Sequence, residues 1–408
     1  MSRYLNHFLI ALALAGGVAV PWLSGSSFTA TLMSQIAIAA VFSVSFNLMW
    51  GTTGLLSFGH ALYFGAGAFT VMHLTRMVND GGLAVPIALL PAAGGLCGLV
   101  LGLVLGSVAT RRGGIAFAMI TMGLGELAFS LSQTLKGTFG GESGISADRT
   151  QGPEMFGLTF GPYLQAYYLI LAWALLCLGM MYYLTKTPLG RIATAVRDNP
   201  ERAGFLQFDP YVVRLMMYVA ASVFAGIAGG LSSLLYEIVT VEALSLNISS
   251  NVVLMSVIGG TGHFFGPVMG ASLVTWLQST LSDHSEAWLF YYGIFFVAMI
   301  VFAPGGLAGI WVGAVRMLTG QNRLAALRAV AGRALRLAPL VMGAVLAIEL
   351  AYRASVVSTR GTELHLFGAI TLDAANLWSW SVPGLCLAAG IWLLAAGRRG
   401  ARKPEDRA

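Results

Sequence analysis

The sequence predicts an all-α membrane protein: a polytopic bundle of transmembrane helices, some of them short or broken. Hydrophobic residues make up 57% of the 408 residues and charged residues only 10%, whereas about a quarter of an ordinary soluble domain is charged. The mean hydropathy is +0.78. The 51 glycines suit helices packed closely in lipid, where small residues let backbones approach. A soluble domain is excluded.

Apolar runs near the length that crosses a bilayer, about 20 residues, recur along the whole chain. We expect about twelve spans, ten in a core and two in a C-terminal extension, some of them short or broken by glycine. They fall at residues 8–23, 28–50, 54–74, 84–109, 114–134, 163–184, 212–236, 248–260, 264–281, 288–310, 337–355 and 379–396. The first run resembles a secretory signal, but its cleavage context is poor and we expect an uncleaved span.

Lysine and arginine orient these spans, because short loops rich in them stay on the cytoplasmic side of a membrane. They gather at Arg3, Arg111 and Arg112, and in residues 185–211, 313–336 and 398–407. All five places lie on one side of the membrane if both termini are cytoplasmic. The net charge of +6 is thus explained by topology. A nucleic-acid surface would interleave basic and aromatic residues, and none is present.

The same patterns divide the chain into three parts. Residues 1–312 form a transmembrane core with a charged cytoplasmic loop at 185–211. Residues 313–336 alternate arginine with leucine and alanine at helical spacing, which predicts a basic amphipathic helix lying on the lipid surface. Residues 337–408 form a two-span extension with a basic cytoplasmic tail.

Motifs for catalysis and for metal or cofactor binding are missing. The chain has no G-x-x-x-x-G-K-[ST] phosphate loop, no H-E-x-x-H and no G-x-S-x-G. Cys97, Cys177 and Cys386 lack the spacing of a metal or disulfide framework and are interpreted as small apolar residues. We therefore expect no catalytic residue, no metal site and no ATP hydrolysis by this chain itself.

The loop "PLGRIATAVRDNPERAGFLQFDP" concentrates charge in a chain that has little. It predicts a short amphipathic helix over "RIATAV", a stop at "DNP" and a second helix at "ERAGFL". One interpretation is an ordinary solvated loop. The other is docking in a cleft of a soluble partner, with Ala193, Val196 and Ala203 buried there and Arg197, Asp198 and Arg202 pairing at the rim.

Polar and glycine residues within the spans are candidates for lining a translocation path or for helix packing. They are Asn47, Ser57, His60, Gly65, Gly67, Glu126, Gly259, Gly260 and Gly262. Irregular backbone at membrane depth is tolerated where it is buried in protein or lines a cavity. We interpret His60 and Glu126 as a pair: either a proton relay or, as we favour, a hydrogen bond between helices.

Three stretches together carry a resemblance to a known family. They are "NLMWGTTGLLSFGHALYFGAGAFT", the loop above with "YVVRLMMYVAASVFAGIAGGL" after it, and "VLMSVIGGTGHFFGPVMGASLV" followed by "FAPGGLAGIW". From about residue 28 to 312 the chain resembles the Liv-type membrane subunits of bacterial branched-chain amino acid ABC importers. It is most similar to the M-type subunit, in which "RGGIAFAMITMGLGE" is also familiar.

The resemblance implies a permease of the bacterial inner membrane that pairs with a second, similar permease. Its other implied partners are two cytoplasmic ATPases, which would bind ATP and Mg, and a periplasmic substrate-binding protein. The residues that the resemblance assigns to the ATPase contact are Ala195, Arg197, Asp198, Asn199, Pro200, Glu201 and Ala203. The implied cargo is a branched-chain or other small hydrophobic amino acid.

Other functions stay open at this point. The same family also moves urea, short amides and aromatic acids. A different class, an ion-coupled carrier that works alone, would need a coupling-ion site. A membrane enzyme acting on lipids would need a polar catalytic cluster near the bilayer surface, and the sequence offers none.

Overall fold

The computed structural model describes residues 17, 19–153, 157, 159–284, 288–319, 339–340, 342–352, 363–366, 370–373, 377–386 and 388–390. The contacts divide it into two compact units. One comprises Met1–Ser279 with Phe296–Gly309, and the other Thr280–Phe295 with Ile310–Ala408. Each unit is described by itself.

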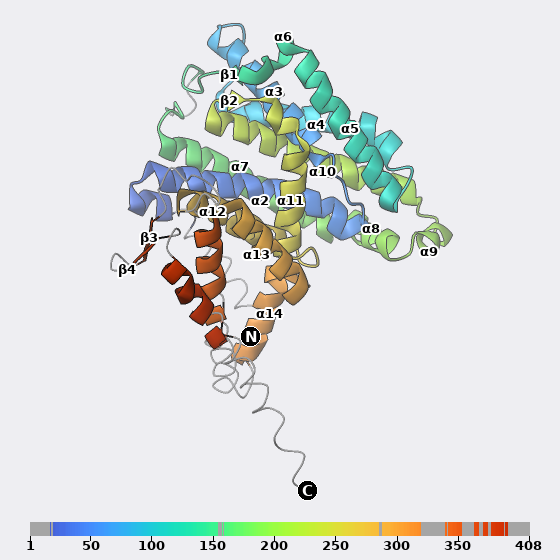
Figure 1. The fold of residues 1–408 in the computed structure, drawn as a ribbon. Coiled ribbons are helices and arrows are strands. Elements are labelled where there is room, and N and C mark those ends of the chain that lie inside the picture. Colours follow the sequence, from blue (N-terminus) through green and yellow to red (C-terminus); the bar gives the residue numbers. More distant parts are fainter. Residues whose placement is uncertain are drawn as a thin grey trace. The chain divides into compact units, whose positions relative to one another are not determined.

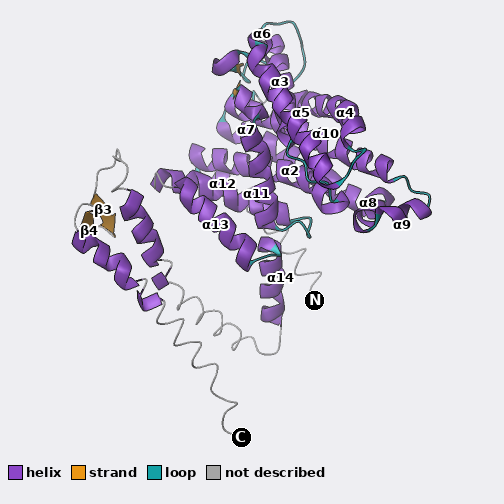
Figure 2. Cartoon of the chain, turned by 45° about the vertical axis from the view of Figure 1, so that its right-hand side comes forward, coloured by secondary structure: helices purple, strands orange, loops and turns teal. Residues whose placement is uncertain are grey.

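Helices make up most of the described chain (Figures 1 and 2). The long apolar helices are α2 (Ser27–Thr53), α3 (His60–Asn79), α4 (Leu90–Ala109), α5 (Gly114–Thr134), α7 (Tyr163–Lys186) and α10 (Pro210–Tyr236). Shorter helices follow: α11 (Leu246–Gly259), α12 (Gly266–His284), α13 (Trp288–Phe302) and α14 (Gly306–Thr319). The connecting elements are η1 (Ile87–Leu89), α6 (Lys136–Phe139), η2 (Gly141–Ser143), α8 (Pro188–Asp198), α9 (Pro200–Phe205) and η3 (Val241–Leu244).

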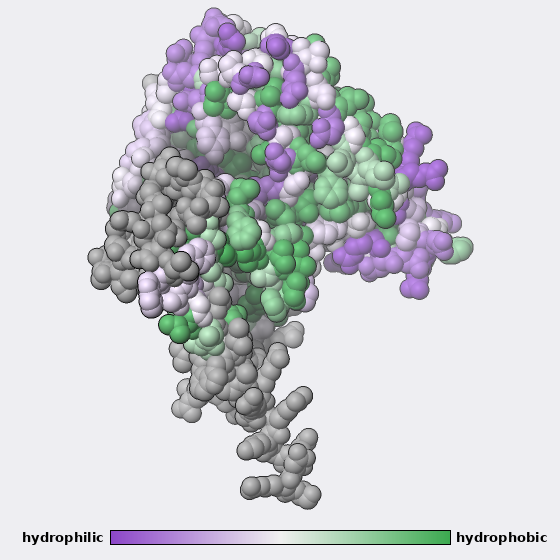
Figure 3. All heavy atoms as spheres, in the orientation of Figure 1, coloured by the Kyte–Doolittle hydropathy of each residue, from purple (hydrophilic) through white to green (hydrophobic). Residues whose placement is uncertain are grey.

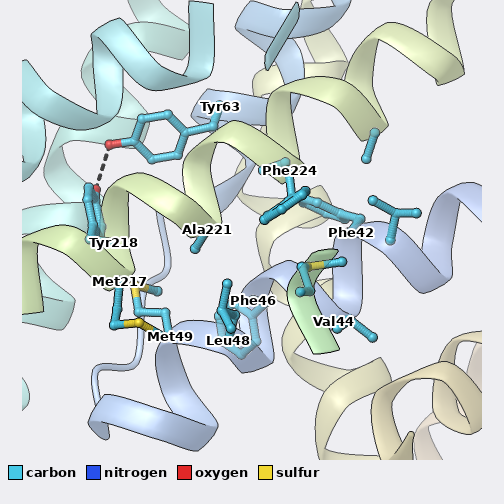
Figure 4. Close-up of a cluster of buried hydrophobic side chains, with 14 of the residues drawn as sticks. Phe42, Val44, Phe46, Leu48, Met49, Tyr63, Met217, Tyr218, Ala221 and Phe224 are labelled. Atoms are coloured by element: carbon cyan, nitrogen blue, oxygen red, sulfur yellow. Dashed lines mark hydrogen bonds between the residues drawn. The ribbon is translucent and has the colours of Figure 1, made fainter. Parts of the chain in front are cut away.

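Helices α2 and α10 form the centre of the first unit. Helix α10 packs against α2, α3 and α4, and α2 packs against α7 and α11 (Figure 1). Their most apolar windows are 72% and 61% buried, against 17% for α5 at the periphery. Figure 4 shows the core between them, where Phe42, Phe46 and Met49 of α2 meet Met217 and Phe224 of α10. Burial of this surface holds the two central helices together.

Two tyrosines bring a polar contact into this core. The hydroxyls of Tyr63 and Tyr218 lie 2.6 Å apart and hydrogen-bond, as the dashed line in Figure 4 marks. Both rings are buried, so each hydroxyl needs a partner within the protein. The bond therefore ties α3 to α10 through their side chains.

Glycines bring α3, α4 and α10 into backbone contact. A Cβ on Gly67 would lie 2.2 Å from the Gly226 carbonyl oxygen, and one on Gly98 would lie 2.2 Å from that of Ser222. Small residues are the usual means of close helix packing in lipid. The structure therefore supports the interpretation of Gly67 as a packing residue.

Hydrophilic residues gather at two places on the first unit, with apolar residues between them (Figure 3). One place, which we call the basic end, is formed by α8 and α9 with Arg111 and Arg112. The other, the hairpin end, is formed by α6, η2 and the antiparallel pair of strands β1 (Ile145–Ser146) and β2 (Ile238–Val239). Long helices with an apolar band between two polar ends have the surface of a multi-pass membrane protein.

Arg149 fastens the loop after β1 to the last turn of α10. Its guanidinium donates hydrogen bonds to the carbonyl oxygens of Leu234 at 2.9 Å and Phe160 at 2.9 Å, and it lies 3.7 Å from the Glu237 carboxylate. A cation at a helix C-terminus satisfies carbonyls that have no helical partner. Nearby, hydrogen bonds from Thr150 hold the pKa of Asp148 below its usual value.

The second unit contains shorter elements. Its helices include residues Met342–Tyr352 and Ser381–Gly390, and its strands β3 (Glu363–Leu366) and β4 (Ile370–Asp373) pair antiparallel ahead of η4 (Leu377–Trp380). The buried Glu349 accepts a hydrogen bond from the Tyr291 hydroxyl at 3.1 Å. Most of the predicted amphipathic helix at 313–336 and most of the first predicted span lie outside the described residues.

The all-α prediction is confirmed, and two span predictions need correction. The span expected at 54–74 begins later, because α3 starts only at His60 and residues 54–59 are not helical. The run at 288–310 is broken at Ala303–Gly305, where α13 and α14 meet at 55°. Within the described residues, five helices are long and apolar enough to span a membrane, or six with that bent pair. The prediction of twelve spans stays a prediction.

The glycine contacts generate a first test. Gly67→Ala would push a methyl group into the backbone of α10, and overpacking of this kind costs about 1–3 kcal/mol. We expect a lower unfolding temperature in detergent. The matched control is Gly179→Ala on α7, where a Cβ has nothing within 4 Å and the change should stabilise the helix slightly. Equal stability of the two variants would contradict the packing role.

Candidate functional site

The charged loop folds into two short helices for local reasons. Helix α8 begins with Pro188 in its first turn, which suits the fixed backbone of proline. It ends because Pro200 forces Asn199 into an extended conformation, with φ −157° and ψ 100°. The Asn199 side chain then accepts a hydrogen bond from the Arg202 amide at 2.9 Å and caps α9. The predicted break at "DNP" is therefore confirmed.

Arg197 turns inward from α8. Its Nη1 donates to the Gly51 carbonyl oxygen in the last turn of α2, while Nε and Nη2 each donate to Asp198 Oδ1 at 3.1 Å. A cation beside the C-terminal carbonyls of a helix is favourable. The Arg197 methylenes also pass close to Gly54, whose φ of +72° ends α2. Arg197 thus connects the loop to a central helix.

The expectation that a partner would bury Ala193, Val196 and Ala203 is wrong. They are at most 3% exposed in this chain alone, because α8 packs against α2, α7 and α10, and α9 packs against α8 and α10. The apolar face of α8 is already used to hold the loop on the bundle. The surface left for a partner is instead made of Ala195, Asp198, Pro200, Glu201, Arg202, Phe205 and Leu206, all exposed.

Arg197 and Asp198 pair with each other, as their 3.1 Å contact shows. The side chains of Arg197 and Asp198 are 39% and 69% exposed, so solvent screens the pair and its own contribution to stability is small. Asp198 therefore remains able to contact a second protein. Arg202 is exposed on α9.

His60 lies at the break between α2 and α3, deep in the bundle. Its Nε2 is 2.9 Å from the Ser45 hydroxyl of α2, and its ring stacks on Phe42 with centroids 5.3 Å apart. The amide of Ala61 next to it donates to the Ser249 hydroxyl of α11 at 2.9 Å. Because Ser45 lies about 12 Å before the end of α2, the chain folds back into the bundle before α3 begins.

His60 and Glu126 do not form the predicted pair. His60 is 1% exposed and bonds to Ser45, whereas Glu126 is exposed on the outer face of α5. His60 and Glu126 are far apart in the sequence, so the sequence does not tell whether their side chains point toward each other. Neither the proton relay nor the hydrogen bond between helices that we favoured is present.

The remaining polar candidates are buried. Asn47 is 6% exposed, and its Oδ1 has no hydrogen-bond partner among the described residues. Ser57 is fully buried and accepts a hydrogen bond from the Gly59 amide at 3.3 Å. Ser57 belongs to the irregular segment at 54–59 that precedes His60, whereas the Asn47 side chain lies beside Gly51 of its own helix.

Most of the candidate glycines permit close approach. A Cβ on Gly65 would meet Leu244 of η3 at 2.6 Å, and one on Gly259 would meet the Gly266 carbonyl oxygen at 2.1 Å. Gly260 has a φ of +95° and lies against Gly305 and Gly306, so the two breaks touch. A Cβ on Gly262 would have nothing within 4 Å, so space does not require glycine there.

Sequence reasoning missed Ser45, Ser249 and Arg149. Serines inside apolar runs are common in membrane helices and usually bond to their own helix, so nothing in the sequence marked these two. Arg149 stood in a loop of mixed charge. Within the described chain no cluster of three or more His, Cys, Asp or Glu could hold a metal ion.

The fold and this arrangement define a class: a multi-pass helical membrane protein with broken helices in its interior and a folded, charged loop at one end. Residues 28–304 match the sequence profile of the family described as "Branched-chain amino acid transport system / permease component". The match covers more than half of the chain. The chain therefore belongs to this family of transport permeases.

Individual relatives agree with the profile. The chain is 26% identical over 343 residues, 78% of each chain, to the "High-affinity branched-chain amino acid transport system permease protein LivM" of Salmonella typhimurium. It is 27% identical over 324 residues, 74% of each chain, to the protein of the same name from Escherichia coli. A "Probable branched-chain amino acid transport permease protein LivH" of Methanocaldococcus jannaschii is 24% identical over 304 residues, 69% of this chain and 92% of that one. No solved structure shows a significant match.

The cap of α9 generates a second test. Asn199→Ala removes the side chain that accepts from the Arg202 amide, and loss of such a cap costs a helix about 1 kcal/mol. We expect faster hydrogen exchange at the amides of residues 201–205 and unchanged exchange in α10, which has its own cap at Asp209. Asp209→Ala is the matched control, with the reverse pattern. Unchanged exchange in α9 would show that tertiary contacts alone hold it.

Proposed function

We propose that this chain is the membrane-spanning permease subunit of an ABC importer, driven by ATP hydrolysis in separate cytoplasmic subunits. The observation that carries the proposal is the α8–α9 segment. It is folded, held on the bundle by its buried alanine and valine residues, and joined to α2 by Arg197. A soluble motor that moves this segment would also move a central helix of the bundle.

The proposed orientation follows from charge. The basic end carries Arg111, Arg112 and the α8–α9 segment, and short loops rich in lysine and arginine remain in the cytoplasm. In a bacterial inner membrane the hairpin end would then face the periplasm and a substrate-binding protein. The names of the relatives support a branched-chain or similar hydrophobic amino acid as cargo.

A second permease is the partner that we propose for α5. Its outer face is apolar, with Ile115, Met119 and Leu127 exposed, yet Glu126 lies on the same face near the middle of the helix, about 18 Å from its start. A carboxylate at the centre of a bilayer costs several kcal/mol unless protein or water surrounds it. Cover by a second protein accounts for both the apolar surface and the carboxylate.

The ATPase contact is tested by Asp198→Ala in the reconstituted complex of both permeases, the ATPases and the binding protein. We expect the protein to remain in the membrane while cargo-stimulated ATP hydrolysis falls severalfold, because an exposed charge at the contact is lost. Arg197→Ala should act in the same direction by freeing the segment from α2. Arg112→Ala, a basic-end change outside the segment, is the control. Stimulation equal to that of the wild type would refute the coupling role, and transport by the isolated chain on an ion gradient would favour a secondary carrier.

The subunit contact is tested by Glu126→Leu. If a polar group of the second permease meets this carboxylate, less of that subunit should co-purify with the tagged chain. Met119→Leu on the same face keeps the surface apolar and should leave recovery unchanged. Recovery that is undiminished by Glu126→Leu would contradict the placement of the second permease on α5.

A further inference from the structure

A cavity of about 470 Å³ lies within the first unit, towards the hairpin end. Six elements surround it: α2, α3, α10, η3, α11 and α12, with β2 beside them. Its size falls within the range of about 300–1,000 Å³ that is typical of small-molecule sites. Three of the surrounding elements, η3, α11 and α12, belong to the broken part of the fold, and discontinuous helices are where transporters commonly place their sites.

The wall of the cavity is mostly apolar. Ile38 and Phe42 of α2, Phe64 of α3, and Val252 and Met255 of α11 line it. Phe42 also stacks on His60, so one residue of the wall contacts the first residue of α3. Such a wall suits an aliphatic or aromatic group of a ligand and leaves the hydrogen-bonding groups of a small polar molecule such as urea without partners.

Polar side chains lie on both sides of the cavity: Gln35 of α2, Ser232 and Tyr236 of α10 and Thr240 after β2 on one side, and Asn251, Thr275 and Gln278 of α11 and α12 on the other. Gln278 Nε2 donates to Asn251 Oδ1 at 3.3 Å, and Thr275 lies beside them in the wall. Glu242 of η3 is exposed and also lines the cavity. No lysine or arginine is present among the residues described as lining the cavity. These groups can bind an ammonium group and donate to a carboxylate, but they offer no cation for a multiply charged anion.

Thr275 differs from the other buried threonines of the bundle. Thr53, Thr75, Thr110 and Thr121 each donate to a carbonyl oxygen of their own helix. Thr275 is only 9% exposed, and its hydroxyl has no partner within the described chain. A buried hydroxyl without a partner is costly. The hydroxyl oxygen is itself closed to solvent, so Thr275 lines the cavity with its other atoms.

We propose that this cavity is a cargo-binding site within the permease chain, one that takes an α-amino acid with an apolar side chain. The side chain lies against Phe42, Phe64 and Met255. The carboxylate accepts from Gln278, and the ammonium group is directed towards Glu242. The inference rests on the proposed function, and it selects hydrophobic amino acids over urea and over anionic cargo.

The test uses the complete complex in proteoliposomes, supplied with saturating binding protein loaded with L-leucine or L-alanine. Ala39→Phe places a ring in the cavity wall and should lower leucine uptake at least tenfold while reducing alanine uptake much less. Ala172→Phe, on the exposed side of α7, is the matched control and should leave the leucine-to-alanine ratio unchanged. A purely structural role of Ala39 would lower both rates together and would overturn the inference.

A more conservative variant guards against misfolding. Gln278→Leu keeps the length of the side chain and removes its amide, and it should lower uptake of both amino acids about tenfold, the equivalent of one hydrogen bond to a charged group. Thr75→Val, whose hydroxyl bonds to Val71 in its own helix, should not change uptake. Wild-type uptake rates in Gln278→Leu would refute the proposal.

Occupancy is measured directly with Ala39→Cys in a chain whose native cysteines are replaced by alanine. A membrane-impermeant thiol reagent added at the hairpin end should label it, and 10 mM L-leucine should slow labelling severalfold. If a lipid acyl chain fills the cavity instead, leucine will give no protection and the proposal fails. A wild-type complex that hydrolyses ATP but moves no amino acid would refute the proposed function itself. Normal transport with no effect of Ala39→Phe or Gln278→Leu would refute only this site.

Discussion

Backbone that leaves helical geometry at membrane depth must find its hydrogen-bond partners inside the protein, because lipid supplies none. The breaks at 54–59, 260–265 and 303–305 all lie in close contact with other helices, and local bonds such as those of the Gly59 amide to Ser57 and the Gly260 amide to Ser256 serve part of their backbone. Gly59 lies against the Thr121 carbonyl of α5, and Gly260 against Gly305 and Gly306. Serine hydroxyls complete the bonding, as Ser249 does for the Ala61 amide. The interior arrangement of α3, α11 and α14 depends on these contacts.

Sequence patterns were sufficient where a local signal decided the structure. Long apolar runs predicted α2, α4, α5, α7 and α10, and the proline after Asn199 predicted the end of α8.

Sequence patterns failed where tertiary contacts decided the structure. The stretch "GLLSFG" at 54–59 is as apolar as a transmembrane helix, so the sequence did not predict its irregular backbone. The pattern of Ala193 and Val196 predicted a buried face correctly, but an amphipathic pattern does not say which surface covers it. Glu126 and His60 illustrate the same limit for intramembrane charges.

Helix α2 connects features that are far apart in the sequence. Its first half lines the cavity through Ile38 and Phe42, its middle contacts His60 through Ser45, and its last turn accepts the bond from Arg197. A rigid helix transmits displacement along its length, and packed interfaces change between discrete arrangements more readily than they deform. A physical route therefore exists between the basic end and the cavity that requires no intermediate domain.

The contacts of Arg149 hold the α10 side of the cavity opening more firmly than the side formed by α11 and α12. On one side, Tyr236 and Ile238 line the cavity next to the end of α10. There the Arg149 guanidinium contacts the Leu234 carbonyl and the Glu237 carboxylate. On the other side, Asn251 and Gln278 belong to α11 and α12, which are joined through a glycine-rich turn. Widening of the mouth should consequently proceed by displacement of α11 and α12, with α10 as the stationary wall. The largest molecule that could enter would then be set by how far that one side can yield.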